Sequence, residues 1–210
     1  MIQIVKTFGV LFTLKLFEMR SLLICIIVFL SLSLFAQSTE FKSFERKGLI
    51  IGAAFGVSSI HLSFPEQASF SQTNASFPNI KIGAMISPKL AILAYLPGTV
   101  YSYSGNGSRK RDRGFEGIVP SVQYWLKDRW WLLGGAGLGM DAPAFYDIKN
   151  ESERKFYFGS TLLAGTGFEL WRWKNCALDL QGRVQYGTAK MPEGIRKGVA
   201  FSVGVGLNLY

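Results

Sequence analysis

Large apolar residues alternate with small or polar ones along most of this 210-residue chain. Residues 198–210, GVAFSVGVGLNLY, show the pattern clearly, because Val199 and Phe201 fall on one face while Ala200 and Ser202 fall on the other. A repeat of two residues predicts a β-strand, and no stretch sustains the 3.6-residue repeat of a helix. Turn signals separate eight such stretches. The predicted strands cover about 48–60, 78–87, 89–103, 114–127, 129–140, 155–170, 176–187 and 198–210.

The two faces of these strands differ in charge. The large apolar face carries no charge over its central part, and every charged residue well inside a strand falls on the small, glycine-rich face. That face suits a confined interior better than an open, water-facing surface. We therefore expect a buried charge network that holds the strands together, with a proton or ion path as the alternative. The charged residues are Lys81, Glu169, Asp179 and Arg183.

The connections alternate in length. Short turns join the second strand to the third, the fourth to the fifth and the sixth to the seventh, and roughly 10 to 17 polar residues make each other connection. An even strand number and an outward apolar face are also typical of outer-membrane barrels. Lipid offers the backbone no hydrogen bonds, so the sheet must close on itself. The predicted fold is all-β: an eight-stranded antiparallel transmembrane up-and-down β-barrel over 48–210, with a bulge or break at Pro97.

All five tryptophans lie beside the short turns. Aromatic side chains at that level are typical of the girdle that meets the membrane–water interface. The pattern therefore predicts an interfacial ring made by Trp125, Trp130, Trp131, Trp171 and Trp173.

The N-terminus has the features of a secretory signal peptide. Basic residues precede the uncharged run 22–36, and the sequence FAQS follows it. The run has 15 residues, fewer than the roughly 20 of a membrane-spanning helix, although an uncleaved anchor is the alternative. We expect cleavage near Ala36–Gln37, so that 1–37 is a signal peptide and 38–47 a polar lead-in to the barrel. The basic residues are Lys6, Lys15 and Arg20.

Export restricts the partners and the chemistry. Translation starts at either Met1 or Met19, and the exported chain keeps a single cysteine, Cys176, which we expect to be an inert thiol rather than half of a disulfide. The formal net charge of +9 would suit nucleic acid, but an exported chain meets a negatively charged cell surface instead. The sequence contains no metal-ligand cluster, P-loop or dinucleotide motif, so we expect no metal and no cofactor.

By architecture, 48–210 resembles the small outer-membrane barrels of the OmpA transmembrane-domain and OmpX-like class. The last strand matches the sorting signal of that class, with its aromatic one residue late. The resemblance implies the outer membrane of a Gram-negative bacterium and recognition by its assembly machinery. The sequences FAQS and SVQYWLKDRWWLLGGAGLG are similar to those of Bacteroidetes barrels. The signal residues are Ser202, Gly204, Leu207, Leu209 and Tyr210.

One predicted external loop is strongly basic. The sequence SRKRDR, residues 108–113, carries four cations around one acid. Such a group could bind the phosphates of lipopolysaccharide or another polyanion, with a merely solvated loop as the alternative. The cations are Arg109, Lys110, Arg111 and Arg113.

His61 and Ser63 provide the one enzymatic alternative. They share a face near the outer end of the first strand and resemble the His-x-Ser motif of lipid A deacylase barrels, which are serine hydrolases. In that family the motif lies late in the chain, and here the nearest acid is Glu66 in the following loop.

The sequence therefore predicts a non-enzymatic barrel with a structural or interaction role, which contacts outer-membrane lipid and lipopolysaccharide or joins a larger surface complex. A lipid A or phospholipid acyl hydrolase is one alternative. A narrow channel or carrier of small apolar ligands is the other.

Overall fold

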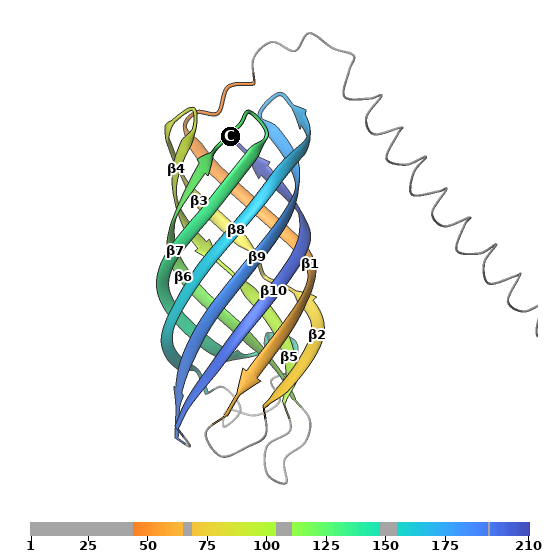
Figure 1. Ribbon diagram of the computed structural model, residues 1–210, viewed down its shortest axis with the longest axis vertical. Coiled ribbons are helices and arrows are strands. Elements are labelled where there is room, and N and C mark those ends of the chain that lie inside the picture. The colour runs from red at the N-terminus through yellow and green to blue at the C-terminus, as the bar shows by residue number, and fades with distance from the viewer. Residues whose placement is uncertain (1–43, 65–68, 104–110, 148–154, 193) are drawn as a thin grey trace, which may run out of the picture. The chain divides into compact units, whose positions relative to one another are not determined.

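The computed structural model describes residues 44–64, 69–103, 111–147, 155–192 and 194–210. Their regular structure consists of antiparallel strands and one 3₁₀ turn, η1 (Phe145–Asp147) (Figure 1). Among these residues, none belongs to a helix long and apolar enough to cross a membrane. The strands are β1 (Leu49–Ser63), β2 (Phe70–Ser76), β3 (Ile80–Ser87), β4 (Leu90–Leu96), β5 (Gly98–Tyr103), β6 (Arg111–Trp125), β7 (Trp130–Pro143), β8 (Tyr157–Trp173), β9 (Cys176–Met191) and β10 (Gly194–Leu209).

The strands close into a barrel because β10 pairs with β1 along its length, from Ile51 opposite Leu209 to Ser63 opposite Lys197. At two places around the barrel, two short strands follow one another along the same neighbouring strand and together take the place of one long strand. Strands β2 and β3 both pair with β1, and β4 and β5 both pair with β6. The barrel thus has eight strand positions, and the structure confirms the predicted fold class.

Prolines mark both broken positions. Pro97 separates β4 from β5, at the break that the sequence predicts. The second break lies between β2 and β3 at the Phe77–Pro78 cis peptide bond, and the sequence analysis did not anticipate it. Proline cannot donate a ladder hydrogen bond, so Pro78 and Pro97 cannot continue the pairing at these two points.

Beyond the breaks, β2 and β5 are neighbours without a backbone ladder, since β2 pairs with β1 and β5 with β6. A side-chain amide joins them instead. Gln72 Nε2 donates to the Ser102 carbonyl at 2.7 Å, and the Ser102 N–H donates to Gln72 Oε1 at 2.9 Å. Gln72 thereby supplies the two hydrogen bonds that a neighbouring strand would make.

Short turns join β3 to β4, β6 to β7 and β8 to β9, and they define the short-turn end of the barrel, where the C-terminus lies (Figure 1). The opposite end is the loop end. The prediction of a long connection before the last strand was wrong: β9 runs to Met191 and β10 begins at Gly194. Strands β1, β6 and β7 also reach further toward the loop end than predicted. Polar residues continue the ladder there because backbone pairing does not require an apolar face.

The apolar faces point outward and the small, polar faces point inward, as predicted. In β1, Phe55 and Val57 are 64% and 61% exposed, whereas Ser58 is 1% exposed. Ile50, Ile60 and Leu62 are inward apolar exceptions in this strand and are fully buried. The wall is therefore inverted relative to a water-soluble sandwich, and its outer face matches hydrocarbon.

The predicted tryptophan ring is only partly correct. Trp130, Trp171 and Trp173 are exposed on the outside, but Trp125 and Trp131 are buried inside the barrel. The alternation of the strands causes this, because neighbours such as Trp130 and Trp131 must point to opposite faces. Space inside comes from glycine: a Cβ atom on Gly167 would lie 2.2 Å from Cζ2 of Trp131.

Candidate functional site

The barrel interior holds four groups of charged and polar side chains. The first lies at the short-turn end around the Glu169 carboxylate, which is fully buried. Arg46 Nη2 and Arg172 Nε donate to it at 2.7 Å each, Trp125 Nε1 at 2.8 Å and the Tyr210 hydroxyl at 2.9 Å. A carboxylate with this many donors is held in its ionised form and in one orientation.

Arg46 belongs to the predicted polar lead-in, residues 38–47. Its side chain is 5% exposed, and its guanidinium lies 4.7 Å from the ring centre of Trp125 and 5.5 Å from that of Phe44. The segment before β1 thus fills the short-turn end of the barrel. Nothing in the sequence of this short polar stretch distinguishes Arg46 from the exposed Lys47 beside it.

The second group contains Lys81 and Asp179, which both contact Trp131. Lys81 Nζ lies 4.8 Å from the Trp131 ring centre and donates to Gln123 Oε1 at 3.0 Å. Asp179 Oδ2 accepts from Trp131 Nε1 at 3.1 Å and from Asn208 Nδ2 at 2.8 Å. The buried indole therefore holds an acid and a base in one layer of the interior.

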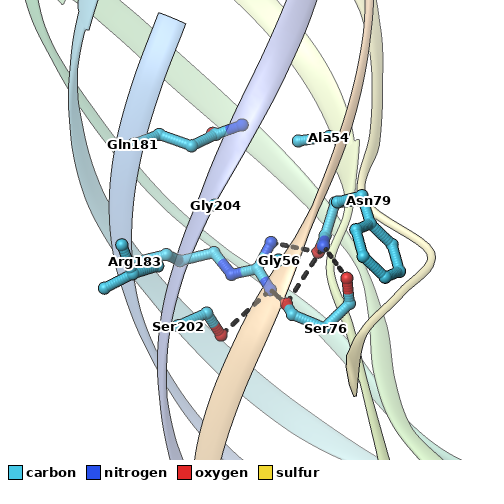
Figure 2. A pocket seen from close by; sticks show the side chains of 10 residues that line it. Ala54, Gly56, Ser76, Asn79, Gln181, Arg183, Ser202 and Gly204 are labelled. Carbon is cyan, nitrogen blue, oxygen red and sulfur yellow. Dashed lines mark hydrogen bonds between the residues drawn. The ribbon is translucent and has the colours of Figure 1, made fainter. Parts of the chain in front are cut away.

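The third group surrounds Arg183, which reaches from β9 toward the two breaks in the wall (Figure 2). Its guanidinium donates to Asn79 Oδ1, to the Tyr95 hydroxyl at 2.9 Å and to Ser76 Oγ at 2.8 Å. A weaker contact at 3.4 Å reaches the carbonyl of Gly98. Arg183 thus binds polar groups of both interrupted strand positions.

The fourth group lies toward the loop end and was missed by the sequence analysis. Asp141 is fully buried and accepts from Arg113 Nε at 2.5 Å, from the Tyr101 hydroxyl at 2.5 Å and from Arg196. The Arg196 guanidinium also lies 4.3 Å from the ring centre of Phe64. Alternation could have found Asp141 and Arg196, because they continue the inward parity of β7 and β10 past the predicted strand ends.

The four residues predicted to form one charge network do not pair with one another. The structure places Lys81, Glu169, Asp179 and Arg183 inside the barrel, but within the described chain no ion pair joins any two of them. The ion pairs of Glu169 go to Arg46 and Arg172 instead. The four residues belong to three separate layers because they lie on strands that cross the barrel at different heights.

The basic loop prediction is also changed. Arg113 was expected in an external loop, but it lies in β6 with its side chain 11% exposed and paired to Asp141. Arg111 lies in the same strand, and Arg109 and Lys110 lie outside the described residues. The strand continues through this basic stretch because inward Arg113 finds a carboxylate inside the barrel.

Beyond the strands, η1 folds back on Asp112. The Asp112 N–H donates to Asp147 Oδ2 at 2.9 Å, and the Tyr146 hydroxyl donates to Asp112 Oδ2 at 3.3 Å. Partial burial and the Asp112 carboxylate raise the pKa of the Tyr146 phenol, so the phenol keeps the proton that it donates.

His61 is exposed on the outer wall, and its Nδ1 lies 2.9 Å from Oγ of Ser71 on β2, rather than from Ser63. Ser63 is half-buried at the end of β1, and Glu66 lies outside the described residues. Cys176 has a free thiol, and the described residues contain no group of three potential metal ligands.

The C-terminal strand places its sorting-signal residues on both faces. Ser202 and Gly204 point inward, and Leu207 and Leu209 are 50% and 44% exposed on the outside. Tyr210 follows them and turns inward to Glu169.

No protein-family model and no curated protein matches this chain. Among solved structures, Ail, the attachment invasion locus protein of Yersinia pestis, is similar with a TM-score of 0.51 and 12% identity, over 78% of this chain and 99% of Ail. Neisserial surface protein A is similar with a TM-score of 0.50 and 16% identity, over 77% of this chain and 96% of that one. At these identities the likeness concerns the fold alone, and it is the fold of small outer-membrane β-barrels.

Proposed function

We propose that this protein is a non-enzymatic outer-membrane barrel that acts through its outer surface, by contact with lipopolysaccharide or a larger surface complex. The observation that carries the proposal is the filled interior. Side chains occupy it from Glu169 at the short-turn end to Asp141 near the loop end, and the cavity beside Arg183 measures only about 10 Å³. An eight-stranded barrel is just wide enough for such filling, and along the described strands this favours an interaction role over a channel.

The outer wall supports lipid headgroups as the contact. In β1 the outward residues are apolar as far as Val57 and then become polar at Ser59 and His61. At the same end, Lys190 and Lys197 are exposed on the neighbouring strands β9 and β10. The two lysines are therefore at the height where the hydrocarbon ends, and phosphate groups would be their natural partners.

The proposal includes a route to the outer membrane. The signal peptide 1–37 would direct export and be removed, and the assembly machinery would read strand β10. The loop end, with its lysines, would face outward, since outer-membrane barrels place short turns toward the periplasm. A partner in a surface complex would bind at the same end.

Conductance and lipid binding test the proposal. The purified barrel in a planar bilayer should show no steady large conductance steps, and such steps would contradict a filled interior. In nanodiscs, the double variant Lys190→Gln/Lys197→Gln should bind phosphorylated lipid A several-fold more weakly than the wild type. The matched control is Lys47→Gln, because Lys47 is exposed at the short-turn end. Equal lipid A binding by the double variant and the wild type would exclude this contact.

A second candidate function rests on the His61–Ser71 contact, since a serine within hydrogen-bond distance of a histidine is the first requirement for a serine nucleophile. Mass profiles of lipid A from cells with wild type, Ser71→Ala and Ser63→Ala distinguish the roles. We expect identical profiles. Removal of an acyl chain that depends on Ser71 would instead identify an acyl hydrolase.

A further inference from the structure

Arg183 is a buried cation whose hydrogen-bond partners are all neutral. Its side chain is 8% exposed, and its two terminal nitrogens donate only to oxygens of amide, hydroxyl and carbonyl groups. Its Nε–H has no hydrogen-bond partner among the described residues. The partners are Asn79 Oδ1, Tyr95 Oη, Ser76 Oγ, Ser202 Oγ and the Gly98 carbonyl.

The other buried arginines each form an ion pair with a carboxylate. Arg113 and Arg196 share the Asp141 carboxylate, and Arg46 and Arg172 share that of Glu169. In the described part of the chain, Arg183 has no carboxylate within ion-pairing distance. A charge removed from water is costly unless an opposite charge neutralises it, so the Arg183 layer lacks a negative charge that the others have.

A small cavity lies in this layer (Figure 2). Arg183 and Gln181 lie on two sides of it, and Gly56 of β1 and Gly204 of β10 border it. Ser76, Asn79 and Ser202 also line it, and the lining contains no carboxylate. Its volume of about 10 Å³ suits one particle of water size and is too small for phosphate or sulfate.

We propose that a monatomic anion, chloride in the cell, occupies this cavity and neutralises Arg183. The guanidinium supplies the positive charge, and its free Nε–H is the donor available to such an ion. The hydroxyls of Ser76 and Ser202 border the cavity but already donate to the Gly98 carbonyl and to Ser58 Oγ. The anion would be an internal part of the folded barrel that holds the two broken strand positions together through Arg183. This site does not depend on whether the outer surface binds lipopolysaccharide.

Crystals of the wild-type barrel refolded and grown in sodium bromide test the site directly. We expect an anomalous difference peak in the cavity at contact distance from the Arg183 guanidinium. The proposal would be overturned if the anomalous peaks showed an adventitious ion at the protein surface only. It would also be overturned if the cavity held a water molecule without anomalous signal. This result requires no variant, so it does not depend on how substitutions fold.

Variants provide a second readout. In Ser202→Asp, a carboxylate would lie next to Arg183 Nη2, which is 3.3 Å from Ser202 Oγ, and the bromide peak should disappear. For the wild type, the urea midpoint should be higher in sodium chloride than in sodium gluconate of equal ionic strength. Arg183→Met should lose that difference, whereas Lys47→Met, which removes the same charge from the surface, should keep it. A wild-type midpoint independent of the anion would contradict chloride binding.

Discussion

Arg46 and Glu169, 123 residues apart in sequence, form a buried ion pair of 2.7 Å that joins the segment before β1 to strand β8. Tyr210, the last residue, donates to the same carboxylate. Both ends of the described chain therefore meet at one side chain of β8. The contact couples closure of the short-turn end to the pairing of β1 with β10.

We expect Arg46→Met to lower the free energy of unfolding by about 2 kcal/mol, because it leaves a buried carboxylate with fewer donors. Lys47→Met is the control, since the Lys47–Glu45 pair is exposed and should contribute less than about 1 kcal/mol. Urea unfolding, followed by the shift between folded and heat-denatured bands on gels, measures both. Equal midpoints for the two variants would show that Arg46 does not stabilise the barrel.

Gly167→Ala should destabilise the barrel by about 1–3 kcal/mol, because the added Cβ atom would lie 2.2 Å from the Trp131 ring. Gly182→Ala is the matched control on the adjoining strand, where the nearest atom to a new Cβ is 4.0 Å away. Unfolding in urea should separate the two alanine variants clearly. A Gly167→Ala barrel as stable as Gly182→Ala would mean that Trp131 has room to move.

Asp141→Asn should cost about 3–5 kcal/mol of stability, because it leaves Arg113 and Arg196 buried beside a neutral group. Asp128→Asn removes the same charge from a side chain that is 75% exposed and should have little effect. A double-mutant cycle with Arg196→Met should show strong coupling between Asp141 and Arg196. Additive effects would contradict a direct ion pair.

Brominated lipids should quench the outward tryptophans and spare the inward ones. Replacement of Trp171 by Phe, which removes a ring whose residue is 56% exposed, should reduce the quenchable share of the fluorescence. Trp131→Phe should leave the quenched intensity unchanged, because Trp131 is 2% exposed inside the barrel. If quenching fell equally in both variants, Trp131 would contact lipid and belong to the interfacial ring.

The alternation of residues was enough to find the barrel and the side of each strand that meets lipid. It failed at strand ends, where Lys190 and Arg196 were assigned to a loop although they lie in β9 and β10. Outside the hydrocarbon a strand needs no apolar outer face, so its residues look like a polar loop. The short strand β2 was missed for the same reason, since its outward Ser71 and Thr73 are polar.

Which residues of a regular strand point inward can be worked out from the amino-acid pattern alone, because a period of two assigns successive side chains to opposite faces. That includes Lys81, Glu169, Asp179 and Arg183. Which of these inward residues contact one another follows from the folded barrel, since partners depend on strand tilt and on the register between strands. Glu169 pairs with Arg46, which lies outside the strands, and Arg183 donates to residues beside the two proline breaks. In each case the partners reach the same height of the interior once the barrel has closed.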